Sequence, residues 1–158
     1  MGYQKSNETT EGKKAFSKAL KYLAIKPRSR KELNDKLKDK KFSLEVVENI
    51  LKKIDGLGYL NDEDFAKSFL ELKKSMGKGK IFIARELKRK GVDEEIIKGV
   101  LFRFYSETDE HEIAKTLAQK KFPNYPELKP RETIKLKNLL FQRGFSWEII
   151  DKFLTFKN

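Results

Sequence analysis

The fold is organised around one stretch, Asp55-Gly56-Leu57-Gly58-Tyr59-Leu60-Asn61-Asp62-Glu63-Asp64-Phe65-Ala66, which ends one helical segment and begins the next. Gly56 and Gly58 can end a helix because they lack the Cβ atom that clashes at positive φ. Asn61 is a good N-cap residue, and the three acidic residues after it complement the positive end of a helix dipole. On local physics alone, the stretch also fits an ordinary helix–helix turn. Its apolar residues predict a connector that packs between units; these are Leu57, Tyr59 and Leu60.

The composition predicts a soluble protein with an anionic partner. The 158 residues include 36 Lys and Arg against 24 Asp and Glu, a net charge of +12. Such an excess suits nucleic acid, an acidic protein surface or a membrane surface. There is no cysteine, so disulfides and thiolate metal sites are excluded. No apolar run is long enough to span a membrane, and residues 1–11 contain no hydrophobic signal region. We therefore expect a cytoplasmic location and no membrane contact.

Apolar residues recur with helical spacing along nearly the whole chain, and no alternating run suggests a strand. We expect helices over residues 13–25, 62–75, 80–90, 108–121, 131–143 and 147–156. A capping box, Ser29-x-x-Glu32, predicts another helix, and Ser43 and Asp93 are expected to cap two more. Residues 1–12 are polar and unpatterned, and we expect them to be disordered.

The three thirds of the chain repeat one another at a spacing of about fifty residues. A helix ends at a breaker residue, an apolar residue follows, and an N-cap residue then opens the last helix of each repeat. The equivalent positions are Leu37, Leu87 and Leu140; the breakers Lys41, Gly91 and Gly144; and the caps Ser43, Asp93 and Ser146. The sequence therefore predicts an all-α fold, an elongated tandem array of three three-helix repeats over residues 13–56, 57–105 and 106–158.

The sequence offers no support for catalysis, a metal site or a cofactor. His111 is the only histidine, and its acidic neighbours Glu110 and Glu112 suit a solvated surface side chain. The Gly77-x-Gly79 pair follows no strand and is better explained as a helix break than as a phosphate loop. We therefore expect a binding protein and not an enzyme.

Positive charge concentrates in the second helix of each repeat, and the first repeat holds most of the excess. The last helices begin with acidic residues such as Glu45, Glu95 and Glu148, which would repel DNA phosphates. Sequence-specific reading of a duplex by these helices is therefore not expected, although the three-helix unit resembles a helix-turn-helix reader. Arg85, Lys88 and Arg89 share one helical face. Stacked repeats would align such faces into a basic strip, and a merely solvated lysine-rich face is the alternative.

Several motifs together resemble the signature of RecX regulatory proteins over about residues 13–156. They are Ala19-Leu20-x-Tyr22-Leu23, Ser29-x-x-Glu32-Leu33, Gly58-Tyr59-Leu60-Asn61-Asp62, Phe65-Ala66, Arg85-Glu86-Leu87-x-x-Lys90-Gly91-Val92 and Arg143-Gly144-Phe145-Ser146-Trp147-Glu148-Ile149-Ile150. The chain departs from the family pattern after Gly79, where Lys80, Ile81 and Phe82 replace the more usual Pro and Arg. Phe82 is expected to be either an exposed partner anchor or a core residue.

The resemblance implies a regulator of the RecA recombinase that needs no cofactor. Family members lodge in the helical groove of the RecA–DNA filament and inhibit its ATPase, strand-exchange and coprotease activities. We expect a monomer that binds the RecA filament, with single- or double-stranded DNA as a further partner. A RecA-independent, sequence-nonspecific nucleic-acid-binding protein is the first alternative, and a structural adaptor for some other acidic protein is the second. The candidate partner-binding residues are Arg28, Arg30, Lys38, Lys40, Lys78, Lys80, Arg85, Lys88, Arg89, Lys90 and Arg143.

Overall fold

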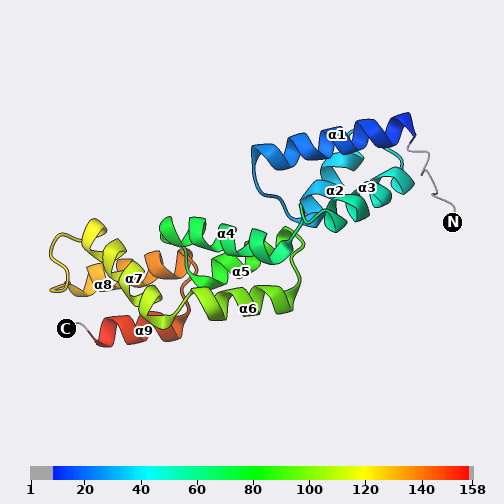
Figure 1. Cartoon of the computed structure of the whole chain (residues 1–158). Coiled ribbons are helices and arrows are strands. Elements are labelled where there is room, and N and C mark those ends of the chain that lie inside the picture. The colour runs from blue at the N-terminus through cyan, green and yellow to red at the C-terminus, as the bar shows by residue number, and fades with distance from the viewer. Residues whose placement is uncertain (1–8, 157–158) are drawn as a thin grey trace. The chain divides into compact units, whose positions relative to one another are not determined.

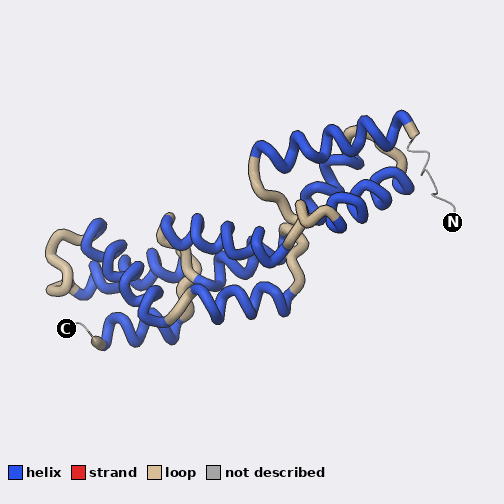
Figure 2. The backbone as a smooth tube through the Cα atoms, in the orientation of Figure 1, coloured by secondary structure: helices blue, strands red, loops and turns tan. Residues whose placement is uncertain are grey.

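The described part of the chain, residues 9–156 of a computed structural model, consists of helices and connecting loops without any strand (Figures 1 and 2). The helices are α1 (Thr10–Ile25), α2 (Arg30–Asp39), α3 (Leu44–Gly56), α4 (Asp62–Ser75), α5 (Lys80–Arg89), α6 (Glu94–Phe104), α7 (Glu107–Lys121), α8 (Pro130–Gln142) and α9 (Trp147–Thr155). The predicted all-α class is confirmed.

The predicted N-terminal tail is partly wrong. Residues 1–8 of it lie outside the described residues, but α1 begins at Thr10, three residues before the expected start. Thr9 caps this helix, because its hydroxyl accepts a hydrogen bond from the backbone N–H of Gly12 at 3.0 Å. A local cap therefore extends the helix into a segment that shows no apolar periodicity.

The repeated breakers share one backbone conformation. Lys41, Gly91 and Gly144 all have positive φ, with values of 63°, 78° and 93°. The N-caps also behave alike, since the side chains of Ser43, Asp93 and Ser146 each accept a backbone N–H from the following turn. The repeat seen in the sequence is therefore a repeat of helix ends as well as of apolar positions.

The chain divides into two compact units, with one boundary inside α4. Unit 1 comprises the chain up to Phe65 together with Lys90–Val92, and unit 2 comprises Ala66–Arg89 and the residues from Asp93 onward. The core of unit 1 lies where α1, α2 and α3 pack together and includes Leu33, Leu37 and Ile54.

In unit 2, α5 packs on α6, and α9 packs on both α7 and α8. Leu87 of α5 and Leu140 of α8 are fully buried, as is their equivalent Leu37 in unit 1. This common burial confirms the register of the repeat. Most of the second repeat lies in one compact unit with the third, and the exact repeat boundaries stay a prediction.

The connector after α3 is more exposed than expected. Leu60 is buried, but Leu57 and Tyr59 are 51% and 58% exposed, so their predicted packing is wrong. Gly58 has a φ of 77°, and the N–H of Tyr59 donates to the carbonyl of Ile54 at 3.1 Å. Backbone hydrogen bonds of this Schellman type close the turn without apolar burial of its side chains.

Candidate partner-binding surface

Helix α5 carries an exposed cationic face in unit 2. Ile83 and Leu87 are fully buried, whereas Arg85, Lys88 and Arg89 are exposed. Arg89 forms an ion pair with Glu86 at 3.2 Å on the same helix, a weak interaction at this exposure. Arg85 and Lys88 have no acidic partner among residues 9–156. The face is therefore available to an anionic partner.

The aromatic ring of Phe82 contacts two cationic side chains, those of Lys78 and Arg85. The Lys78 ammonium lies 4.5 Å and the Arg85 guanidinium 5.7 Å from the centroid of its ring. Phe82 is half-buried, and its backbone and Cβ lie so close to Gly144 that no Cβ would fit there. Phe82 is thus neither a free anchor nor a fully buried core residue. It supports cations through cation–π contacts.

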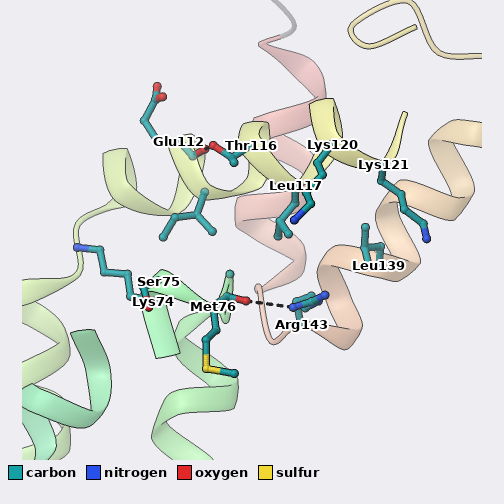
Figure 3. A pocket seen from close by; sticks show the side chains of 12 residues that line it. Lys74, Ser75, Met76, Glu112, Thr116, Leu117, Lys120, Lys121, Leu139 and Arg143 are labelled. Atoms are coloured by element: carbon teal, nitrogen blue, oxygen red, sulfur yellow. Dashed lines mark hydrogen bonds between the residues drawn. The ribbon is translucent and has the colours of Figure 1, made fainter. Parts of the chain in front are cut away.

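Lys78 lies close to other positive charges. Partial burial lowers the pKa of Lys78, and the positive charges of Arg143 and Lys73 lower it further. Arg143 is held nearby, because its Nη1 donates to the carbonyl of Met76 at 3.1 Å (Figure 3). Lys78 and Arg143, which are 65 positions apart in the sequence, therefore act on each other directly. A bound anion would relieve their repulsion.

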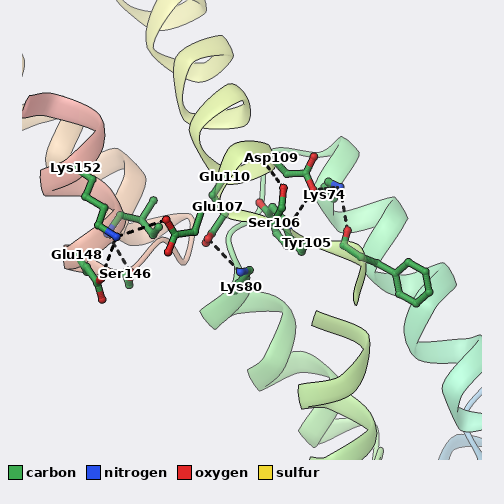
Figure 4. Close-up of polar contacts among 12 residues, drawn as sticks. Lys74, Lys80, Tyr105, Ser106, Glu107, Asp109, Glu110, Ser146, Glu148 and Lys152 are labelled. Carbon is green, nitrogen blue, oxygen red and sulfur yellow. Dashed lines mark hydrogen bonds and ion pairs between the residues drawn. The ribbon is translucent and has the colours of Figure 1, made fainter. Parts of the chain in front are cut away.

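Lys80 forms an ion pair within unit 2. Its Nζ lies 3.3 Å from the carboxylate of Glu110, which is only 3% exposed (Figure 4). Burial raises the pKa of Glu110, and the charge of Lys80 acts against that rise. Beside it, the hydroxyl of Tyr105 donates to the carbonyl of Lys78 at 2.8 Å. These contacts hold the start of α5 against the start of α7.

The candidate residues of unit 1 differ in their surroundings. Arg28 is nearly buried and donates from Nε to the carbonyl of Tyr22 at 3.2 Å. Arg30 forms an exposed ion pair with Asp55 at 3.4 Å. The other two candidates of the first repeat are exposed, without an ion pair to any described residue; these are Lys38 and Lys40.

Lys90 belongs to a polar network in unit 1. Its Nζ lies 2.5 Å from the carboxylate of Glu32, and its carbonyl accepts a hydrogen bond from the hydroxyl of Ser29. Ser29 also caps α2, and Glu32 accepts a bond from the N–H of Ser29 at 3.2 Å, completing the predicted capping box. Lys90 therefore has a structural role here, and its role in partner binding stays a prediction.

The structure brings Lys78, Arg85 and Arg143 together around Phe82 and the turn at Gly144, with Lys88 and Arg89 further along α5. Sequence reasoning overlooked Lys73, which contributes to the positive charge around Lys78. No sequence signal distinguishes Lys73 from other exposed lysines, because its proximity to Lys78 results from the turn at Gly77.

His111 differs from its predicted surroundings. The imidazole is half-buried and packs edge-on against the ring of Phe153, with centroids 5.1 Å apart. Among the described residues, no group of three or more His, Cys, Asp or Glu side chains could hold a metal ion. No helix within residues 9–156 is both long enough and apolar enough to cross a membrane.

Three segments of the chain match family models of RecX. Residues 15–53 match the first three-helix domain, residues 61–101 the second and residues 107–154 the third. The chain also resembles the crystal structure of RecX from Lactobacillus salivarius, with a TM-score of 0.83 and 31% identity over 92% of this chain and 95% of that one.

Curated relatives carry the description regulatory protein RecX. The protein from Legionella pneumophila is 36% identical over 88% of this chain and 91% of its own length. That of Caldanaerobacter subterraneus subsp. tengcongensis is 37% identical over 92% and 71%. The Bacillus subtilis protein is 36% identical over 89% of this chain but 53% of its own length. The chain thus spans about half the length of the Bacillus relatives.

Proposed function

The chain belongs to the RecX family of regulatory proteins, and we propose that it binds the RecA–DNA filament in the cytoplasm and inhibits the recombinase. Inhibition would extend to the ATPase, strand-exchange and coprotease activities. The proposal includes a monomeric protein with the three repeats as its domains. It acts by binding, and it uses no cofactor.

The observation that carries the proposal is the exposed cationic face of α5, formed by Arg85, Lys88 and Arg89 (the α5 face). A filament groove is lined by DNA phosphates and protein surface, and clustered cations add long-range attraction to short-range contacts. The apolar side of α5 is anchored in the core by Ile83 and Leu87. The face is thus presented on a rigid element.

The test reverses the charge of the α5 face with the triple variant R85E/K88E/R89E. Glu has nearly the helix propensity of Arg and Lys, so the helical circular dichroism spectrum should stay like that of the parent. We expect inhibition of the DNA-dependent RecA ATPase to be lost or to require far more protein. The matched control, K115E/R131E/K135E, changes the charge of three exposed residues of unit 2 by the same amount.

Full inhibition by the folded triple variant would exclude the α5 face as the contact surface. Equal loss of inhibition in the control would show that only the net charge matters. Loss of inhibition in the triple variant, with inhibition kept in the control, is the result that supports the α5 face as the contact surface.

A second candidate function is nonspecific nucleic-acid binding without RecA, which the net charge of +12 favours. Counterion release then predicts affinity for bare DNA that falls steeply with salt. The last helices argue against sequence-specific reading, because the exposed acidic residues Glu45, Glu95 and Glu148 lie in their first turns. DNA binding by a parent protein that affects no RecA activity would favour this second function.

A further inference from the structure

A cleft of about 690 Å³ lies in unit 2 between the end of α4, α7 and the end of α8 (Figure 3). Its apolar lining comes from Ile113 and Leu117 of α7 and Leu139 of α8. These side chains are partly buried against a core of α7, α8 and α9 that includes Leu136 and Leu140. Gly77 shapes one side, since a Cβ at this position would lie 3.1 Å from a Leu117 methyl group. The volume falls within the range of ligand-binding clefts, about 300–1,000 Å³.

The rim of this cleft is strongly cationic. Lys74, Lys120, Lys121 and Arg143 line it, against the single acidic residue Glu112. Lys74 is engaged, because its Nζ pairs with Asp109 at 2.9 Å and donates to the carbonyl of Phe104. Lys120 and Lys121 are exposed and form no ion pair within the described chain. The cleft therefore offers positive charge that no internal carboxylate neutralises.

Arg143 is positioned by its backbone contact and keeps further donors. Nη1 donates to the Met76 carbonyl at 3.1 Å. A guanidinium has five N–H donors in a planar fork, a geometry that suits a carboxylate. Met76 borders the cleft and is 49% exposed, and methionine adapts its shape readily to a bound apolar group.

The chemistry of the lining distinguishes between two anionic ligands. Nonspecific binding of single-stranded nucleic acid relies on aromatic side chains that stack on the bases. The residues lining this cleft include no aromatic side chain, and its apolar part is aliphatic. Aliphatic side chains between cations instead complement a peptide in which apolar residues alternate with carboxylates.

We propose that this cleft binds an acidic peptide segment of a partner protein, with one aliphatic side chain inserted between Ile113, Leu117 and Leu139. Carboxylates flanking that side chain pair with Lys120, Lys121 and Arg143. The three residues of the α5 face do not line the cleft, whereas Arg143 both lines the cleft and acts on Lys78 of the candidate partner-binding surface.

The test measures binding of the full chain to a fluorescently labelled synthetic peptide in which leucines are spaced between glutamates. The variant K120E/K121E should weaken binding about tenfold or more at low salt, because it places like charges opposite the peptide. The control K115E/K135E makes the same charge change at exposed positions outside the lining and should weaken it less than about threefold.

Two further arms localise the site and identify the ligand class. The peptide should shift the NMR methyl signals of Ile113, Leu117 and Leu139, and replacing its glutamates by Gln or its leucines by Ser should abolish those shifts. If K120E/K121E loses helical structure, K120Q/K121Q replaces it, because Gln carries no charge against the negative end of α7.

Three outcomes would overturn the proposal. The two double variants could weaken binding equally, or the Gln and Ser peptides could bind as well as the parent peptide. Alternatively, oligothymidylate and not the peptide could shift the cleft methyl signals, which would identify a nucleic-acid site.

Discussion

Gly79 and Gly144 meet backbone to backbone in unit 2, and a Cβ atom on Gly79 would overlap the carbonyl group of Gly144. The N–H of Gly79 donates to the carbonyl of Arg143 at 2.8 Å, and the N–H of Ile81 donates to the carbonyl of Gly144 at 3.0 Å. The start of α5 is thus joined to the turn between α8 and α9. This contact explains why most of the second repeat lies in one compact unit with the third.

The substitution Gly79→Ala should destabilise unit 2 by at least about 1–3 kcal/mol, because the atoms that must move belong to the backbone. Urea denaturation measures the free energy of unfolding, and hydrogen exchange in α5 locates the change. Equal stability of Gly79→Ala and the parent protein would mean that the close approach is easily relieved.

Gly56→Ala is the matched control for Gly79→Ala. Gly56 is the last residue of α3, its φ lies outside the left-handed region, and a Cβ added to it would have no atom within 4 Å. This variant should be neutral or stabilising by up to about 1 kcal/mol.

The substitution Lys41→Gly should stabilise unit 1. Lys41 occupies the position of Gly91 and Gly144 and holds a φ of 63°, which costs a residue with a Cβ roughly 1–2 kcal/mol. Lys41→Gly should therefore raise the free energy of unfolding of unit 1 by about 1 kcal/mol. The neighbouring Lys40→Gly should lower it, since Lys40 has a φ of −82° and glycine there only increases the entropy of the unfolded chain. The same sign for both variants in urea denaturation would contradict this explanation.

Leu87 tests the repeat register. It is fully buried, and Leu87→Ala should cost about 2–5 kcal/mol of the free energy of unfolding. Ile81→Ala on the same helix should cost clearly less, because Ile81 is 49% exposed. A loss below about 0.5 kcal/mol for Leu87→Ala, the range of surface substitutions, would show that the core assignment is wrong.

The lowered pKa of Glu32 predicts that the stability of unit 1 depends on pH. Burial alone would raise the pKa of the Glu32 carboxyl, but the hydrogen bond from Lys90, the N–H of Ser29 and the Lys90 charge outweigh burial. The pKa therefore lies below the usual 4.5 in the folded protein. A lowered folded-state pKa stabilises the protein above the unfolded-state pKa, and that contribution is lost as the pH falls through the folded-state value.

Glu32→Gln should accordingly destabilise unit 1 by about 1.5–3 kcal/mol at pH 7, the range for hydrogen bonds to charged groups. The difference from the parent protein should shrink as the pH is lowered below 4.5. Denaturation series at several pH values measure it. Glu48→Gln serves as the control, because Glu48 is exposed on α3 and has no ion pair among the described residues. A loss that is the same at every pH would exclude the ionised Glu32–Lys90 pair as its cause.

Local features of this chain were predictable because they depend on residues a few positions apart. Ser29 and Glu32 form their capping box, Asn61 accepts N–H groups from Glu63 and Asp64, and Gly58 has positive φ. Apolar spacing of three and four positions likewise predicted the burial of Leu37, Leu87 and Leu140. Helix ends and helix faces follow from nearest-neighbour sterics and hydrogen bonding.

The candidate site depended on contacts that no local rule supplies. The sequence identified Lys80, Lys90 and Arg85 as similar cations, yet Lys80 pairs with the buried Glu110 and Lys90 with Glu32, while Arg85 lies over Phe82. Their positions along the chain do not distinguish them, because the partner of each cation depends on which helices pack together.

The amino-acid sequence alone determined nearly all helix positions, the caps Ser29, Ser43, Asp93 and Ser146, and the threefold repeat of this RecX-family chain. Only the tertiary structure decided that Gly79 meets Gly144, that Leu57 is exposed, and that Lys120 and Arg143 line one cleft. The physical reason is range: helix ends are set within about one turn, whereas docking depends on the shape of surfaces far apart in the chain.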